Sequence, residues 1–226
     1  MEISDYNLDT HKHLLASWAA CRAASQGHFK FSVENGTKML LLGVTGKKIR
    51  PTMPAEFIHH INKVKEINKQ EEFDDWHHKT VENMRTGGDF DKVFQSINQK
   101  REKKKKKKKP KLLVPENLTY GIVAKILNVY LKVFYLGDFG KNTFANFIHP
   151  PIDRILLKEL QKESEFFKFD CEPFEHTSTT DSGKIPKWTQ INEEEYKEII
   201  KFIREFIHKN NLKGLWRIEY AWRGHQ

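Results

Sequence analysis

The chain has little cysteine, no long apolar run and no stretch in which apolar and polar residues alternate over the length of a strand. Its two cysteines, Cys21 and Cys171, cannot build a disulfide framework, and neither has the CxxC partner that would indicate zinc. The most apolar stretch, 118–136, is interrupted by polar residues, which argues against a membrane span. The opening "MEISDYNLDTHKH" is polar and mixed in charge, so it indicates no secretory signal. We therefore expect a cytoplasmic protein that uses no metal, no cofactor and no membrane.

An excess of one charge is also absent from most of the chain. The 226 residues are 38% hydrophobic and 31% charged, which is typical of a soluble globular protein able to bury a sizeable core. The net charge is +9, but residues 100–111 hold ten of the 39 Lys and Arg residues and one of the 30 Asp and Glu residues. Because this one segment accounts for the whole net charge, the basicity is local and not a property of the fold.

Apolar residues recur at helical spacing in several segments, and no strand or hairpin pattern competes with them. Before residue 100 the predicted helical faces consist of Leu14, Trp18, Cys21 and Ala24, of Phe57, Ile61, Val64 and Ile67, and of Phe73, Trp76, Val81 and Met84, together with a short helix that Gly43 ends. Near the C-terminus, Asn192 and Glu195 are spaced as a capping box before another helix. The sequence predicts a compact all-α protein.

One predicted helix is apolar on nearly every side. In "NLTYGIVAKILNVYLKVFYLG" the exceptions are Gly121, Lys125, Asn128 and Lys132, spaced four, three and four residues apart. At 3.6 residues per turn these positions form one narrow stripe. We expect this helix to lie in the middle of the fold, with the stripe facing a cleft.

The lysine run divides the chain into two helical portions. Seven consecutive like charges repel one another, so residues 100–111 are predicted to form a mobile loop. Residues 1–99 would be an N-terminal helical portion and residues 112–226 a C-terminal portion that carries the candidate catalytic segment. We expect the two portions to form one compact unit.

Asp153 lies in "FIHPPIDRILLKEL", directly before a predicted helix. Proline is favoured in the first turn of a helix, and an acidic side chain there complements the helix dipole, so Asp153 can serve to start the helix. A carboxylate on a rigid Pro-Pro segment, downstream of a buried helix with a lysine stripe, can equally be held beside a reacting centre. The sequence leaves both interpretations open.

The order of long helix, loop, Pro-hydrophobic-Asp and helix resembles the catalytic segment of the helix-hairpin-helix superfamily of DNA glycosylases. The matching residues are "TYGIVAKILNVYLKVFYL" and "HPPIDRILLKEL", within 118–160, and they look most like the archaeal branch that removes 8-oxoguanine. The resemblance implies a DNA glycosylase that hydrolyses the N-glycosidic bond of a damaged or modified base. Repair and defence against phage with modified DNA are both compatible with such an activity.

The resemblance also implies roles for individual residues. Asp153 would stabilise the positive charge that develops on the sugar and orient water, and Lys125 would share the catalytic site. The base must leave the duplex stack for a pocket lined by aromatic and hydrogen-bonding groups. We expect Trp18, Trp222, His149 and Pro151 to line that pocket, with Trp188 and Trp216 as further aromatic candidates.

The chain departs from the family at two points. The Leu-Pro-Gly-x-Gly hairpin is missing, and "VPENLTYG" keeps only the proline and one later glycine. The lysine that bifunctional members use as a Schiff-base nucleophile would fall within 118–120, where this chain has none. Lys125 lies one to two turns further on, an offset of roughly 7 to 10 Å at 1.5 Å per residue. We therefore predict a monofunctional enzyme, in which Lys125 binds phosphate or extends its ammonium out of the core.

DNA is the expected partner, and the protein is expected to be a monomer. The lysine run would hold DNA phosphates through Lys103, Lys104, Lys105, Lys106, Lys107, Lys108 and Lys109. Further contacts with DNA are predicted for Gly121, Asn128, Lys132 and Arg154. In the simpler alternative, the run is only a solvated loop.

Two other functions remain open from the sequence. The first is a nucleic-acid-binding module without catalysis that uses the lysine run. The second is a helical ribonuclease of the HEPN type, because Arg204 and His208 in "REFIH" resemble the Arg and His of that motif, although the spacing here is shorter. A binding module needs no carboxylate beside a cleft, whereas a glycosylase needs Asp153 there.

Overall fold

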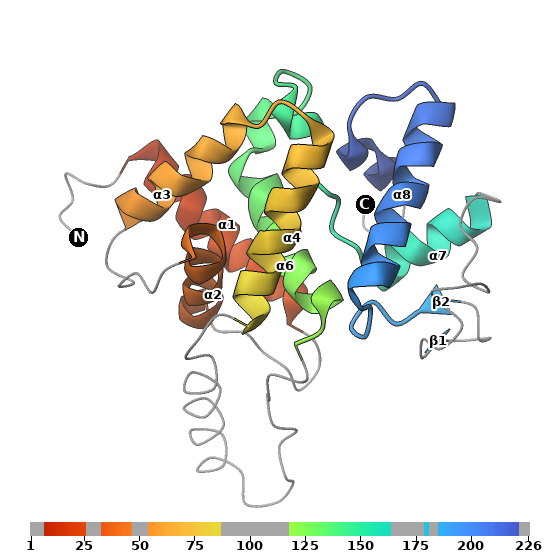
Figure 1. The fold of residues 1–226 in the computed structure, drawn as a ribbon, viewed down its shortest axis with the longest axis horizontal. Helices are drawn as coiled ribbons and strands as arrows, with labels where there is room; N and C mark the ends of the chain where they lie inside the picture. The colour runs from red at the N-terminus through yellow and green to blue at the C-terminus, as the bar shows by residue number, and fades with distance from the viewer. Residues whose placement is uncertain are drawn as a thin grey trace, which may run out of the picture.

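The computed structural model describes residues 7–25, 33–46, 54–86, 118–163, 179–180 and 185–221, and this part of the chain is all-α (Figure 1). The α-helices are α1 (Leu8–Ala24), α2 (Val33–Thr45), α3 (Pro54–Lys63), α4 (Gln70–Thr86), α6 (Tyr120–Phe134), α7 (Arg154–Glu163) and α8 (Glu193–Lys209). The short 3-10 helices are η2 (Val64–Glu66), η4 (Leu136–Asp138), η5 (Phe144–Asn146) and η6 (Leu215–Ala221). The only strands in the described ranges are β1 (Thr179–Thr180) and β2 (Ile185–Pro186), an antiparallel pair. The predicted fold class is confirmed, and no helix in these ranges is long and apolar enough to cross a membrane.

The helix starts follow local side-chain chemistry. Asn7 accepts a hydrogen bond from the backbone N–H of Thr10 at 2.9 Å, which satisfies one of the donors that the first turn of α1 leaves open. At the start of α8, the Asn192 side chain accepts from the Glu195 N–H, and the Glu195 carboxylate accepts from the Asn192 N–H. The predicted capping box is therefore confirmed.

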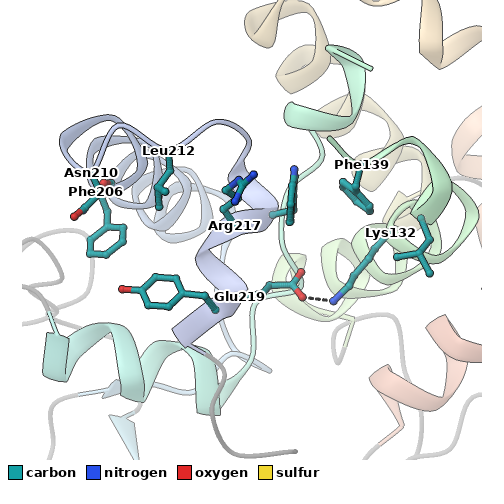
Figure 2. A pocket seen from close by; sticks show the side chains of 10 residues that line it. Lys132, Phe139, Phe206, Asn210, Leu212, Arg217 and Glu219 are labelled. Atoms are coloured by element: carbon teal, nitrogen blue, oxygen red, sulfur yellow. Dashed lines mark hydrogen bonds and ion pairs between the residues drawn. The ribbon is translucent and has the colours of Figure 1, made fainter. Parts of the chain in front are cut away.

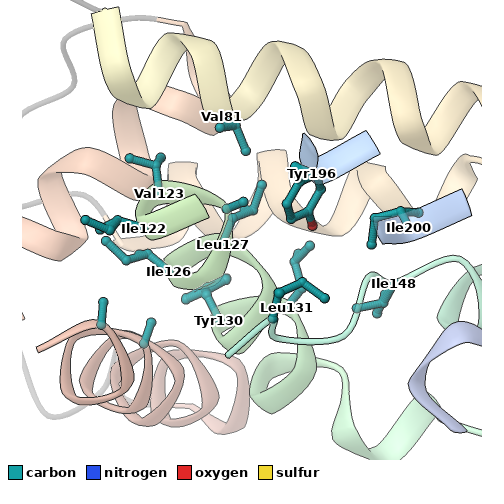
Figure 3. Packing of buried hydrophobic residues seen from close by; sticks show 14 of the residues in the cluster. Val81, Ile122, Val123, Ile126, Leu127, Tyr130, Leu131, Ile148, Tyr196 and Ile200 are labelled. Carbon is teal, nitrogen blue, oxygen red and sulfur yellow. The ribbon is translucent and has the colours of Figure 1, made fainter. Parts of the chain in front are cut away.

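Helix α6 lies at the centre of the fold, as its composition predicts. Val123, Leu127 and Leu131 have no exposed surface, and Figure 3 shows apolar side chains of α6 pointing both towards α1 and towards α4 and α8. Helix α6 packs against α1, α4 and α8, so helices from before and after the lysine run share one core. Full burial of each large aliphatic side chain stabilises the fold by roughly 1.5 to 3 kcal/mol.

The buried face of α1 differs from the predicted one. Cys21 and Ala24 are buried as expected, but Leu14 is 44% exposed and Trp18 is 53% exposed. The face that contacts α6 carries small and polar residues, namely Thr10, His13, Ala16, Ser17, Ala20, Cys21 and Ala24. Small side chains let the two backbones approach closely, and His13 makes a 2.9 Å hydrogen bond with the Tyr130 hydroxyl of α6. The spacing of apolar residues therefore predicted the wrong buried face of α1 at Leu14 and Trp18.

Helix α2 does not end at Gly43. Gly43 is buried inside the helix, where a Cβ atom would lie 2.9 Å from the Thr80 carbonyl oxygen and closer still to the Met84 side chain of α4. The helix ends at Thr45, and Gly46 follows with φ of +64°, a conformation that glycine adopts without strain. Gly43 serves the close packing of α2 on α4, and Gly46 ends the helix.

The C-terminal helices cover the side of α6 that carries the polar stripe. Helix α8 contacts α6 and η6, and α7 contacts η6 and β2 (Figure 1). On α8 the buried positions Tyr196, Ile199, Ile200, Ile203 and Ile207 form one apolar face, as the spacing predicts. The polar residues of α6 are therefore enclosed by α8, by other segments that follow α6 and, at Asn128, by His77 of α4.

Candidate functional site

Lys125 and Asp153, the two predicted catalytic residues, lie side by side. Lys125 projects from α6, and its Nζ is 3.6 Å from Oδ2 of Asp153, which directly precedes α7. The side chains are 7% and 12% exposed, so the pair lies just beneath the surface. Removing two charges from water costs several kcal/mol per ion, and a buried pair is therefore weak evidence for stability. Such pairs are candidates for a functional site.

The two oxygens of the Asp153 carboxylate have different partners. Oδ1 accepts a hydrogen bond from the backbone N–H of Leu156 at 2.9 Å, and the Asp153 carbonyl accepts from Leu157 at 3.0 Å, so the residue starts α7. Oδ2 faces the Lys125 ammonium. Asp153 thus starts α7. Because the Leu156 N–H holds Oδ1, Oδ2 is directed towards the Lys125 ammonium.

Trp188 completes the surroundings of Lys125. The Lys125 ammonium lies 4.2 Å from the centroid of the buried Trp188 ring, a distance at which cation and ring attract each other. The Trp188 segment reaches α6 at Gly121, where a Cβ atom would lie 2.3 Å from the Trp188 carbonyl oxygen. Burial lowers the pKa of Lys125 from its usual value, and the neighbouring Asp153 carboxylate opposes that shift.

Asn128 ties α6 to the loop that leads to Asp153. Its amide nitrogen donates to the Pro150 carbonyl at 3.0 Å and to the Tyr196 hydroxyl at 2.8 Å, and its oxygen lies 2.7 Å from Nε2 of His77. Asn128 has no exposed surface. The predicted contact between Asn128 and DNA is therefore wrong for this structure, because protein groups occupy its amide. Its role is to fix the 148–153 loop beside α6.

A chain of hydrogen bonds continues from Tyr196 through His149 to Asp74. The Tyr196 hydroxyl lies 3.1 Å from Nδ1 of His149, and Nε2 of His149 lies 3.0 Å from Oδ1 of Asp74. Arg204 donates to both Asp74 oxygens, at 2.6 and 2.5 Å. A neutral His149 with its proton on Nε2 satisfies all of these contacts at once. These hydrogen bonds join α4, α8 and the loop before Asp153.

The ionisable side chains in and beside this series of hydrogen bonds have shifted pKa values. Burial alone would raise the pKa of Asp74, but contacts with His149 and Arg204 hold it at about 2. Burial lowers the pKa of His149, which the Asp74 carboxylate opposes, and burial lowers the pKa of His77 well below its usual value. Asp74 is therefore ionised and both histidines are neutral at neutral pH.

A cavity of about 260 Å³ adjoins this chain of hydrogen bonds. Its lining comes mainly from α4 and α8 and consists of Asp74, His77, His78, Tyr120, His149, Tyr196, Lys197, Ile200 and Arg204. Arg204 contacts Asp74 here, whereas His208 is exposed. Because Arg204 is bound to a carboxylate and His208 faces solvent, the geometry gives no support to the ribonuclease alternative.

A larger cavity, of about 690 Å³, lies between the ends of α6 and α8 and the 3-10 helix η6 (Figure 2). Lys132 borders it and forms an ion pair with Glu219 of η6. Trp216 contacts Phe139 on one side, at 5.3 Å between ring centroids, and lies 4.8 Å from the Arg217 guanidinium. Of the residues in the polar stripe, only Lys132 reaches this cavity, so the stripe as a whole is enclosed by protein and does not face an open cleft.

The other predicted site residues are dispersed. His149 and Pro151 are buried in the loop before Asp153, and His149 lines the smaller cavity. Arg154 is exposed at the start of α7. Gly121 is buried under the Trp188 segment, which excludes the predicted contact with DNA. Trp18 lies on the exposed face of α1 and lines neither cavity, so its predicted place in the base pocket is not met.

Three predictions fall outside the described residues. They are the mobile loop at 100–111, the phosphate contacts of Lys103 to Lys109 and the place of Trp222 in the base pocket. Within the described ranges, no group of three or more His, Cys, Asp or Glu side chains is arranged to hold a metal ion.

Asp74, Tyr196 and Glu219 were missed by the sequence analysis. Each pairs with a residue that is far away in the chain, and helical spacing identifies the face of a helix without identifying its partner. A local signal existed for Asp74 alone, since it precedes His77 by three residues and so shares its face.

Comparisons with family models, curated proteins and solved structures gave no match to this chain. The functional argument therefore depends on the geometry of the site and on the sequence patterns.

Proposed function

We propose that the protein is a DNA glycosylase that hydrolyses the N-glycosidic bond of a damaged or modified base. The observation that carries the proposal is the pairing of Lys125 with Asp153 at 3.6 Å. The sequence pattern selected these two residues separately, 28 positions apart. They lie side by side just beneath the surface at the start of α7, and neither of the two described cavities is lined by Lys125 or Asp153, so substrate binding would have to open the surface beside the pair.

The carboxylate suits the charge that develops in this reaction. As the bond between the sugar C1′ and the base nitrogen breaks, positive charge builds on the sugar, and the negative charge of Asp153 stabilises it. A water oxygen then bonds to C1′, and one water proton accompanies the departing base. Oδ1 is held by the Leu156 N–H, so Oδ2 has a fixed direction and little reorganisation is needed during the reaction.

Lys125 acts as a positioning residue in this scheme. Its ammonium contacts Asp153 and the Trp188 ring, and both contacts favour the charged form of the lysine. A charged lysine orients Oδ2 and has no free electron pair with which to attack the sugar. This arrangement supports hydrolysis without strand cleavage.

Binding of DNA is supported by the lysine run. Seven consecutive lysines before the α6 segment can neutralise several phosphates and release their counterions. Such contacts carry no information about the base. Recognition of the base must then come from other residues of the protein.

The test is a screen for base release. The protein is incubated with duplexes that carry different damaged or modified bases, and abasic sites are scored. We expect at least one substrate, and we expect Asp153→Asn to lose at least 100-fold in release, in line with the loss of a group that stabilises transition-state charge. Asparagine is as good a helix cap as aspartate, so this substitution removes the charge and keeps the start of α7.

The matched control is Asp138→Asn, which removes a carboxylate from another lysine pair, Asp138 with Lys65 at 3.0 Å. We expect it to release the base at the wild-type rate. A folded Asp153→Asn protein with wild-type turnover would contradict the proposal and leave Asp153 as a helix cap. Absence of base release from every duplex would favour the module without catalysis.

A further inference from the structure

Four of the ten residues that line the larger cavity are aromatic. Phe139 follows α6, and Phe206 lies near the end of α8 (Figure 2). Trp216 and Tyr220 belong to η6. Tyr220 is 51% exposed and its ring is nearly parallel to that of Phe206, with an interplanar angle of 21°. A volume of about 690 Å³ lies within the range of small-molecule sites. The cavity therefore offers flat apolar surface to a flat ligand.

Glu219 gives this cavity a polar group with unused hydrogen-bonding capacity. One carboxylate oxygen pairs with Lys132, whereas Oε1 is buried and has no hydrogen-bond partner among the described residues. Buried polar atoms are nearly always bonded, so an isolated acceptor needs an explanation. A ligand with an N–H group would supply the missing donor.

Glu219 pairs with a lysine on the same helix that carries Lys125 of the candidate catalytic pair. Lys132 follows Lys125 by seven residues, or roughly 10 Å along α6, and each lysine binds one carboxylate. Burial is the main cause that raises the pKa of Glu219, the Lys132 ammonium opposes the shift, and the charge of Asp153 adds to it.

We propose that this cavity receives the base that is extruded from the DNA, and that Glu219 Oε1 accepts a hydrogen bond from a ring or exocyclic N–H of that base. The inference rests on the proposed function, since it assigns the base subsite of the same enzyme. Tyr220 supplies the stacking surface. The size of the cavity fits a base with an added substituent, so the substrate class is a bulky modified base that carries an N–H donor.

The experiment measures binding of free bases, which needs no catalysis. Two bases with an added substituent, 8-oxoguanine and 5-hydroxymethyluracil, are titrated by calorimetry into the wild type. We expect at least one of these bases to bind the wild type. Glu219→Gln should weaken binding by about tenfold or more, because an acceptor that is charged becomes a neutral amide.

A second variant tests the cavity without disturbing a buried charge. Leu136 lines the cavity and is 64% exposed, so Leu136→Trp should block the site and leave the core intact. Leu8→Trp, at a residue of α1 that is 68% exposed, is the matched control. We expect Leu136→Trp to weaken binding by at least tenfold and Leu8→Trp to retain it.

The outcomes separate the cavity from the proposed function. Binding that Leu136→Trp leaves unchanged would overturn the cavity as the base site, even if the protein releases bases from DNA. Base release at the wild-type rate by Leu136→Trp would overturn it in the same way. Binding that depends on Leu136 and Glu219, in a protein that releases no base from any duplex, would support the cavity and contradict the glycosylase.

Discussion

Lys125 and Lys132 lie seven residues apart on α6, and each binds a carboxylate from a different C-terminal segment. Lys125 pairs with Asp153 before α7, and Lys132 pairs with Glu219 in η6. Seven residues are close to two helical turns, so both lysines point to the same side of the helix. One face of α6 thus positions two carboxylates, and Asn128 between the lysines holds the loop that delivers the first of them.

Asn128 should be essential for stability. Asn128→Leu leaves the Tyr196 hydroxyl, the Pro150 carbonyl and His77 without their buried partner, and each unsatisfied group costs about 1 to 3 kcal/mol. We expect the free energy of unfolding to fall by about 3 kcal/mol or more in denaturant titrations. Asn142→Leu, at an exposed asparagine, should change it by less than about 0.5 kcal/mol. Equal effects of the two substitutions would show that the hydrogen bonds of Asn128 are dispensable.

Acid should destabilise the protein as the pH falls below about 6.5. Burial lowers the pKa of His13 to about 4, whereas an unfolded histidine titrates near 6.5. Between these values the unfolded chain binds more protons than the folded one, so stability falls as the pH decreases from about 6.5 to 4. The lowered pKa values of His77 and His149 add to the same trend. The slope for one such histidine is at most about 1.4 kcal/mol per pH unit.

The measurement is the free energy of unfolding at several values between pH 7.5 and pH 4.5. His13→Gln should reduce the slope, because the neutral amide does not titrate. His208→Gln, at an exposed histidine of α8, should leave most of the slope in place. A slope that His13→Gln does not change would show that His13 titrates in the folded protein as it does in the unfolded chain.

The lysine run should contribute affinity for DNA without base specificity. Replacing Lys103 to Lys109 by a neutral linker of equal length should weaken binding to all duplexes. The slope of log affinity against log salt should flatten by about 0.9 for each phosphate that the protein no longer neutralises. Lys38→Gln, on the surface of α2, is the control and should leave the slope unchanged. If the linker also leaves the slope unchanged, the run does not bind phosphate.

Much of the fold could be predicted because helix formation leaves local signals. The burial of α6, the apolar face of α8 and its capping box all follow from residue spacing. The face of α1 could not be predicted this way, because its contact with α6 depends on small residues and on His13, whereas Leu14 and Trp18 are exposed. Close packing of small residues leaves little apolar signal in the sequence.

The sequence predicted which two residues form the candidate site, but it did not predict how they contact each other. Lys125 and Asp153 were selected from their places on or before a helix, but nothing in the sequence shows that Oδ2 faces the lysine while Oδ1 caps α7. Glu219 carried no local signal, since its partner Lys132 lies 87 residues away. Pairings of this kind are set by how the helices pack, and only the folded structure reveals them.

The proposed glycosylase should release the base without cutting the strand. Strand cleavage by the lyase route requires an uncharged amine that attacks the sugar and forms a Schiff base. Lys125 is the amine nearest to Asp153 in the described site, and its contacts with the Asp153 carboxylate and the Trp188 ring both favour the ammonium. Although burial lowers its pKa, the carboxylate opposes that shift, so the electron pair stays engaged with a proton.

Borohydride trapping on a DNA that the protein processes decides this point. The lysine run could trap abasic DNA without specificity, so the reaction is performed on the variant in which a neutral linker replaces Lys103 to Lys109. We expect abasic product and no covalent adduct. An adduct that forms with this variant and disappears on adding Lys125→Ala would show that Lys125 is the nucleophile, because substrate binding must then separate it from Asp153 and release its proton. In that case the ion pair between Lys125 and Asp153 is the resting state of a bifunctional enzyme.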